Sequence, residues 1–142
     1  MLEHLVLITA AQTGGAFQPV GDAGVEILGA PGARALLELR ERVERRRKVC
    51  AGLSGEVIEV GFGSGLNLPH YPSEVTRVAA VEPSTVSIRL AQARLAGSPV
   101  PVEVVGLDGQ RIDQPDGSFD AALSTWTMCT IPDIDTALIE LR

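Results

Sequence analysis

Short apolar segments alternate along the chain with segments that have helical periodicity. Four apolar segments are rich in Val, Ala or Leu and are followed by turn residues, as buried strands are: 56–61, 77–82, 101–108 and 118–125. Between the second and the third, residues 83–97 have the pattern of a helix, with Ser84 as its N-cap and Gly97 as its stop. Strands that alternate with helices predict parallel βαβ units in an α/β sheet that is covered on both faces.

Two further helices flank this region. Residues 33–51 carry apolar side chains at helical spacing on one side: Leu36, Leu39, Val43 and Cys50. Residues 132–142 begin a helix that has Pro132 near its start. At the other end of the chain, residues 12–32 contain six Gly and two Pro, which is typical of a linker. The pattern therefore predicts an irregular N-terminal arm over 1–32 and one domain over 33–142.

The composition is that of one folded domain. The chain has 142 residues, of which 45% are hydrophobic and 21% charged, and these values exclude a disordered chain. No apolar run reaches the ~20 residues that cross a bilayer, so no membrane span is expected. Cys50 and Cys129 have neither CxxC spacing nor nearby histidines, which favours reduced thiols, no metal site and a cytoplasmic protein.

Charge is segregated along the chain, whose net charge is −6. Residues 34–48 hold seven of the twelve basic residues, and their interleaved signs are typical of a solvated helix face rather than of a nucleic-acid patch. From Leu95 to Leu141, a single basic residue, Arg111, stands against eight acidic ones. An acidic half disfavours a phosphate backbone as partner and suits a neutral or cationic small ligand. No nucleic-acid partner is therefore expected.

Unusual residues follow the end of every predicted strand. The first strand ends in a turn that contains Gly61, Gly63 and Gly65. The later strands end in acidic, small or aromatic residues: Glu82, Asp108, Gly109, Ser124, Thr125 and Trp126. In open α/β sheets, ligands bind beyond the carboxyl ends of the strands, and glycines let the backbone come close to a ligand. The four strand ends therefore predict one binding crevice, although a lone glycine turn would also suit a plain strand-to-helix connection.

The spacing between the glycine turn and the next acidic residue favours a nucleoside ligand. Glu82 lies 21 residues after Gly61, close to the ~20 residues at which a carboxylate accepts hydrogen bonds from ribose hydroxyls. The nicotinamide fingerprint needs a third glycine where Leu66 stands, and no Gly-Lys-Ser/Thr phosphate loop is present. Glu82 could instead serve only as a negative charge at the N-terminus of the next helix. The acidic surroundings favour a nucleoside that carries a positive charge.

Four segments resemble, in order and spacing, the signatures of class I S-adenosylmethionine-dependent methyltransferases: VIEVGFGSG, VAAVEPS, GLDGQRI and SFDAALSTWTMCTIPD. The resemblance covers roughly residues 45–142 and is nearest to small-molecule enzymes of the methyltransferase-11 and methyltransferase-like types. It implies a Rossmann-like fold with a partial parallel sheet, in the order 3-2-1-4 of the predicted strands, flanked by helices. The sheet of that family has further strands, so the resemblance also implies a C-terminally truncated chain.

The resemblance also implies which residues bind S-adenosylmethionine. The matching positions are Glu59, Gly61, Gly63, Gly65, Glu82, Pro83, Asp108, Gly109 and Thr125. Glu59 would approach the amino end of the cofactor directly or through water, Glu82 would bind the ribose diol, and Asp108 would bind the adenine amino group. Trp126 would lie near the acceptor, or else serve as a core aromatic. No catalytic residue is predicted, because in-line methyl transfer needs alignment and exclusion of water more than an acid–base pair.

The resulting prediction is methyl transfer from S-adenosylmethionine to a small-molecule acceptor such as a thiol, a phenol or a quinol. The alternatives are a non-catalytic cofactor-binding module and, less favoured because of Leu66, a nicotinamide-dependent oxidoreductase. In the order 3-2-1-4, the fourth strand would have an open edge. This edge would pair with another chain in a homodimer, or with the N-terminal segment LVLITA as an extra strand.

Overall fold

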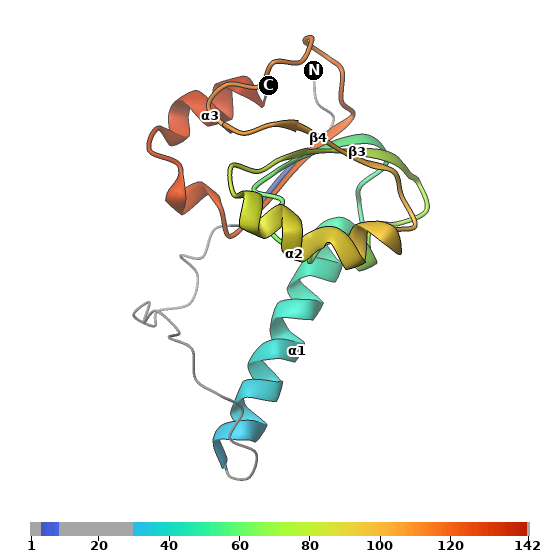
Figure 1. Cartoon of the computed structure of the whole chain (residues 1–142), viewed down its shortest axis with the longest axis vertical. Coiled ribbons are helices and arrows are strands. Elements are labelled where there is room, and N and C mark those ends of the chain that lie inside the picture. The colour runs from blue at the N-terminus through green and yellow to red at the C-terminus, as the bar shows by residue number, and fades with distance from the viewer. Residues whose placement is uncertain (1–3, 9–29, 142) are drawn as a thin grey trace.

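The computed structural model describes residues 4–8 and 30–141, which form a parallel sheet flanked by helices (Figure 1). Its elements are β1 (His4–Ile8), α1 (Ala30–Cys50), β2 (Gly55–Val60), η2 (Leu68–His70), β3 (Val75–Val81), α2 (Thr85–Ala96), β4 (Val102–Gly106), β5 (Ala121–Thr125), η3 (Met128–Thr130) and α3 (Ile134–Glu140). The strand order is β1-β5-β2-β3-β4, and neighbouring strands are parallel. The predicted order 3-2-1-4 corresponds to β4-β3-β2-β5 and is confirmed, together with the α/β fold class.

Successive residues of the central strands face two separate cores. Val57 packs in one core with Cys50, at the end of α1, and with Ala91 of α2. Ile58 packs in the other core with Leu141, which follows α3. Because side chains alternate between the two faces of a strand, a strand covered on both faces must be apolar at nearly every position. This requirement explains the almost continuous apolar strands of the sequence.

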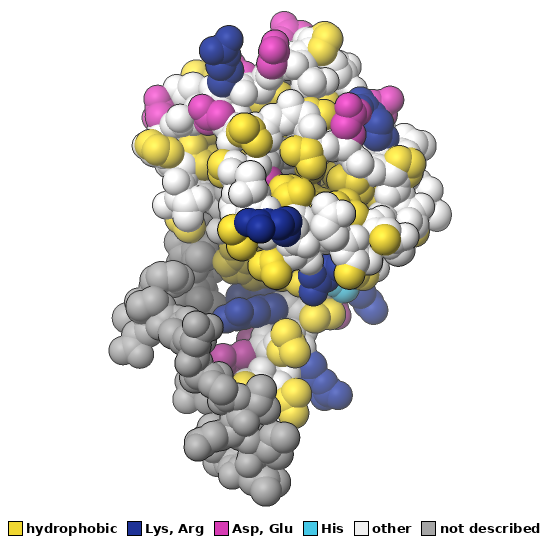
Figure 2. Space-filling view, viewed as in Figure 1, with side chains coloured by type: hydrophobic (Ala, Val, Ile, Leu, Met, Phe, Trp, Pro, Cys, Tyr) yellow, Lys and Arg dark blue, Asp and Glu magenta, His cyan; other side chains and the backbone are white. Residues whose placement is uncertain are grey.

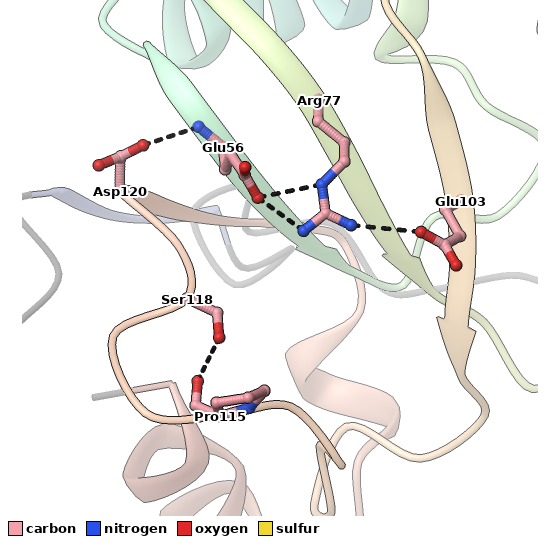
Figure 3. Close-up of polar contacts among 6 residues, drawn as sticks. All are labelled: Glu56, Arg77, Glu103, Pro115, Ser118 and Asp120. Carbon is pink, nitrogen blue, oxygen red and sulfur yellow. Dashed lines mark hydrogen bonds and ion pairs between the residues drawn. The ribbon is translucent and has the colours of Figure 1, made fainter.

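The amino ends of the strands are joined by charged side chains (Figure 3). Arg77 on β3 donates from Nε and Nη2 to Oε2 of Glu56 on β2, at 3.0 and 2.6 Å. Its Nη1 donates to Glu103 on β4 at 3.2 Å. Asp120, just before β5, accepts the backbone N–H of Glu56 at 2.8 Å. These contacts link the starts of four neighbouring strands at the edge of the sheet that lies opposite their carboxyl ends.

Strand β1 changes the expected edge of the sheet. It pairs in parallel with β5, from His4 beside Ala121 to Ile8 beside Thr125. The open edge predicted for the fourth strand is therefore wrong, since β1 occupies it, and the homodimer predicted through that edge loses its basis. The alternative, an extra strand from the N-terminal segment, is the one observed. An irregular arm over 1–32 is likewise wrong at 4–8 and at 30–32, where β1 and the start of α1 form; residues 9–29 lie outside the described part.

Helix α1 extends away from the sheet and touches it only near its C-terminal end (Figure 1). Cys50 is fully buried, whereas Leu36, Leu39 and Val43 are 64%, 57% and 44% exposed. The side of the helix that carries these four residues is therefore buried only at its C-terminal end. A helix of 21 residues is about 32 Å long, more than the ~17–24 Å of strands with five to seven residues. No helix within the described ranges is both long and apolar enough to cross a membrane.

Candidate functional site

Each glycine of the turn after β2 has a backbone that other residues rarely adopt. The φ angles of Gly61, Gly63 and Gly65 are 80°, 60° and 74°, in the left-handed region where a side chain is costly. A Cβ on Gly61 would overlap the side chain of Thr127, and one on Gly65 would come within 3.0 Å of Leu68 Cδ1. A Cβ on Gly63 would meet no atom closer than 3.9 Å. Gly61 and Gly65 therefore allow close packing, whereas Gly63 faces open space.

That open space belongs to a cavity of about 540 Å³ at the carboxyl ends of the strands. All but two of the predicted site residues line it: Gly61, Gly63, Glu82, Pro83, Asp108, Gly109, Thr125 and Trp126. The exceptions are Glu59 and Gly65, which lie outside the lining. Gly65 is a packing residue of the turn, so the role that we expected for it at the ligand does not agree with its position. The structure thus brings the predicted strand ends together in one crevice.

Glu82 connects the glycine turn to the end of β3. Its Oε2 accepts the backbone N–H of Gly63 at 2.7 Å, and its Oε1 accepts the backbone N–H of Ser84 at 2.8 Å. Ser84 in turn caps α2 by accepting the N–H of Ser87 at 3.1 Å. Glu82 is buried but borders the cavity. The carboxylate thus lies at the start of a helix and also borders the cavity.

The loop after β4 supplies the opposite wall of the cavity. Asp108 is exposed, and its Oδ1 accepts the backbone N–H of Gln110 at 2.9 Å. The side chain of Gln110 accepts the backbone N–H of Asp133 at 2.7 Å, which ties this loop to the start of α3. A Cβ on Gly109 would come within 2.7 Å of Val60 Cγ1. Gly109 therefore lets the loop pass close to the end of β2 and places Asp108 at the cavity.

Glu59 lies behind the cavity rather than in it. The side chain is 1% exposed and accepts hydrogen bonds from Asn67 Nδ2 and Tyr71 Oη, both at 2.6 Å. Burial raises the pKa of Glu59 to about 7, although these two hydrogen bonds and the charge of Arg46 act in the opposite direction. A direct approach of Glu59 to a ligand does not fit this geometry. Its oxygens hold neighbouring side chains in place instead.

Arg46 of α1 is a cavity residue that the sequence interpretation missed. Its Nη1 donates to Asn67 Oδ1 at 2.7 Å and to Thr125 Oγ1 at 3.1 Å. Asn67 also donates from Nδ2 to Thr125 Oγ1 at 3.0 Å, so the network runs from Glu59 to the cavity wall. The basic run around Arg46 suggested a solvated face. Its spacing of four residues from the buried Cys50 was the signal that could have identified it.

Trp126 lies between the end of β5 and η3, and it borders the cavity. The Arg46 guanidinium lies 4.5 Å from the centroid of its ring, within the range of a cation–π contact. Within the described ranges, Trp126 is the one residue other than glycine with a positive φ, 57°. Such a backbone costs roughly 1–2 kcal/mol, and strain of this kind is typical of functional sites. The ring thus borders the cavity instead of filling a core.

Metal ligands do not gather in the part of the chain that the structure describes. No group of three or more His, Cys, Asp or Glu side chains there could hold a metal ion. Both cysteines are free, Cys50 buried and Cys129 exposed.

Comparison with known proteins identifies a family and relatives. A family model described as a methyltransferase domain matches residues 58–142. A phosphatidylethanolamine N-methyltransferase of Cereibacter sphaeroides is 28% identical over 108 residues, which cover 68% of this chain and 49% of that protein. The chain thus spans about half the length of this curated relative.

Solved structures share the fold. A SAM-dependent methyltransferase from Aquifex aeolicus has a TM-score of 0.59 and 24% identity, and the match covers 80% of this chain and 66% of that chain. The YcgJ protein from Bacillus subtilis has a TM-score of 0.58 and 16% identity, with 71% and 44% covered. At these identities the likeness establishes the fold alone.

Proposed function

The chain belongs to the methyltransferase domain family, and we propose on that premise that its cavity binds S-adenosylmethionine and presents the methyl group to a small-molecule acceptor. S-adenosylmethionine is the cofactor of this family. The observation that carries the proposal is the contact of Glu82 with Gly63 at the cavity. It places a fixed carboxylate beside the one glycine of the turn that faces open space.

The lining of the cavity fits this cofactor. The volume of about 540 Å³ lies within the ~300–1,000 Å³ that is usual for small-molecule sites. Glu82 uses one lone pair of each oxygen for a backbone N–H. An ionised carboxylate offers about four acceptor positions, so two remain for the hydroxyls of a ribose. The bend at Gly63 leaves room for the ligand to approach the protein backbone, because no Cβ projects there.

Asp108 suits the adenine end. Its Oδ2 has no hydrogen-bond partner among the described residues, so it is available to accept a hydrogen bond from an exocyclic amino group. Leu107, Val81 and Ile131 line the same cavity and offer apolar surface to a flat ring. The glycine at 109 keeps this wall close to the end of β2.

Arg46 suits the methionine end, where S-adenosylmethionine carries a carboxylate. A guanidinium presents several N–H donors in a planar fork that matches a carboxylate. Asn67 and Thr125 hold one of its nitrogens, and Trp126 lies against its face. Glu59 acts on Arg46 indirectly, since it orients Asn67 by accepting a hydrogen bond from Asn67 Nδ2. Arg46 thus binds the carboxylate of the cofactor, and Glu59 positions Arg46 through Asn67.

The cofactor, when bound, supplies an electrophilic methyl group on a positively charged sulfur. The residues of the chain then have to align this group with the acceptor and exclude water, which is where most of the acceleration of an in-line displacement arises. Trp126, Leu66 and Pro132 supply large side chains at the wall of the cavity. They line the same cavity as Thr125, so an acceptor that entered it would meet apolar surface.

Calorimetry with S-adenosylhomocysteine tests the binding part of this proposal. We expect the wild type to bind, and Glu82→Ala to bind about 10- to 150-fold more weakly, because charged hydrogen bonds worth ~1.5–3 kcal/mol are lost. Glu103→Ala is the matched control, since Glu103 lies at the other end of the sheet. Equal affinities of Glu82→Ala and the wild type would remove Glu82 from the site.

Turnover separates methyl transfer from the second candidate, a non-catalytic cofactor-binding module. The chain covers 49% of its curated relative, which is the observation that keeps this candidate. The acceptor panel comprises thiols, phenols and quinols, with phosphatidylethanolamine added because the name of the relative specifies it. Methylated product from any of them supports the enzyme. Tight cofactor binding without product from the whole panel favours the module.

A further inference from the structure

Helix α1 differs in charge from the rest of the chain. Its residues 30–50 include seven basic and three acidic residues, a net charge of +4, whereas the rest of the chain carries −10. Among the side chains of the helix that the structure describes, Arg45 pairs with Glu41 at 3.6 Å and Arg47 with Glu44 at 3.8 Å. Arg40, Arg42 and Lys48 have no acidic partner among the described residues. The positive charge of the chain is therefore concentrated on the element that protrudes from the body.

The protruding half of α1 also exposes apolar side chains. Leu36, Leu39 and Val43, which we call the α1 stripe, are 64%, 57% and 44% exposed. Their spacing of three and four residues places them on one face of the helix. At about 100° per residue, Arg40 and Arg47 flank one side of this face and Arg42 the other. Figure 2 shows hydrophobic and basic side chains gathered on this helix below the body of the molecule.

The α1 stripe shares its helix face with the cavity residue Arg46. Leu39, Val43 and Arg46 follow one another at a spacing of four and three residues, so they lie along one line of the helix. Arg46 borders the cavity and lies over Trp126. A surface in contact with the α1 stripe would therefore lie on the side of α1 that leads to the cavity.

We propose that α1 docks on an anionic lipid surface through the α1 stripe and the basic side chains beside it. Helices that lie in a membrane interface combine an apolar face with Lys and Arg along its borders. The long stems of Arg40, Arg42 and Arg47 can extend beside the apolar face while their guanidinium groups reach the lipid phosphates. The acidic body is repelled by the same phosphates, and its separation from the protruding half of α1 permits contact by the helix alone.

Two other occupants fit the surface less well. A second copy that paired its own α1 stripe with this one would bring together two helices that each carry a net charge of +4, which is unfavourable. A nucleic acid would use the basic residues and would gain nothing from three exposed apolar side chains. A lipid surface satisfies both features at once.

Co-sedimentation with vesicles tests the proposal without cofactor, so its outcome does not depend on the proposed function. We expect the full chain to bind vesicles of phosphatidylcholine mixed with phosphatidylglycerol, and to bind phosphatidylcholine alone much more weakly. Leu36→Glu combined with Leu39→Glu should lower the partition coefficient by roughly tenfold or more. Arg40→Gln should lower it about fivefold, the usual effect of one charge at an anionic surface.

Matched controls come from α2, which also exposes leucine and arginine. Leu90 is 64% exposed, so Leu90→Glu makes a similar change elsewhere, and Arg89→Gln removes one charge there. Both should bind vesicles like the wild type, and a thermal melt verifies that every variant is folded. Equal binding to the two vesicle types, or unchanged binding of the double leucine variant, would overturn the proposal. A wild-type dimer that the double variant abolishes, without vesicle binding, would assign the surface to a second copy.

Discussion

The two ends of the sheet treat their acidic side chains in opposite ways. At the amino end, Arg77 lies between Glu56 and Glu103 and donates to both (Figure 3). At the carboxyl end, Glu82 is held by backbone N–H groups of Gly63 and Ser84. Both arrangements fix the carboxylates, but the second does so without a basic side chain bonded to Glu82 among the described residues. Its negative charge therefore stays available to a ligand.

The difference shows how one residue type can serve two purposes in a single sheet. The ion pairs of the amino end hold strands together and bind Glu56 and Glu103 to one cation, Arg77. The carboxyl end uses neutral dipoles for the same task and keeps its charge in a cavity of about 540 Å³. A positively charged cofactor gains from this second arrangement, because a carboxylate beside a low-dielectric wall acts strongly on a nearby charge. Substitutions at matched positions of the two ends can test this comparison.

The largest difference is expected between Glu59→Ala and Glu56→Ala, three residues apart on β2. Glu59→Ala leaves the buried Asn67 and Tyr71 without their acceptors and should lower the free energy of unfolding by about 2–4 kcal/mol. Glu56→Ala breaks a partly exposed ion pair and should cost about 1 kcal/mol or less. Urea denaturation measures both values. Equal losses would show that the two ends do not differ in this way.

The stability of the chain should depend on pH through Glu59, which lies near the carboxyl end of β2. Its pKa is about 7 in the folded chain against 4.5 without the protein environment. Between these values the folded state keeps a proton that the unfolded state has lost, so stability falls as the pH rises through this window. Relative to Glu59→Gln, the wild type should lose on the order of 3 kcal/mol between about pH 4.5 and pH 7. A difference in the free energy of unfolding between the wild type and Glu59→Gln that stays constant across this pH range would contradict the raised pKa.

Arg46 and Arg77 should differ in their effect on ligands. Arg46→Met should weaken binding of S-adenosylhomocysteine by roughly tenfold or more, because a charged hydrogen bond to its carboxylate is lost. Methylthioadenosine, which lacks the carboxylate, should bind wild type and variant alike. Arg77→Met, at the amino end, should leave both affinities unchanged. Calorimetry with the two ligands decides the matter, and equal weakening for both would mean that Arg46 shapes the site without contacting the carboxylate.

The smallest difference is expected between two glycines with similar backbones. Gly63 and Gly117 have φ angles of 60° and 72°, and neither has an atom within 3.4 Å of an added Cβ. Alanine at either position should cost about 1–2 kcal/mol of stability through backbone strain. Only Gly63→Ala projects a methyl group into the cavity and should lower the affinity for S-adenosylhomocysteine. Loss of affinity in both variants would point to strain rather than to the cavity.

The fold could be predicted from the sequence because its signals are local. The apolar strands, the N-cap at Ser84 and the strand order implied by the resemblance agree with the structure. The family and its cofactor also agree with the comparisons. Residues placed at strand ends reached the cavity, because the carboxyl ends of parallel strands meet at one edge of the sheet.

What escaped the sequence depends on contacts between distant segments. Arg46 reaches the cavity only because the end of α1 lies beside Asn67 and Thr125. Glu59 adjoins the glycine turn in sequence, but Asn67 and Tyr71 enclose it in the fold. The sequence did not decide whether β1 would pair with β5, since a short apolar segment can add to either edge of a sheet or to another molecule.

The pairing of β1 with β5 also bears on how the chain is made. His4 is bonded into the sheet beside Ala121, so the two strands are separated by most of the chain. A ribosome releases the residues of β1 long before those of β5, and contacts of such large separation slow folding. Strand β1 can thus take its place beside β5 only after more than a hundred further residues have left the ribosome.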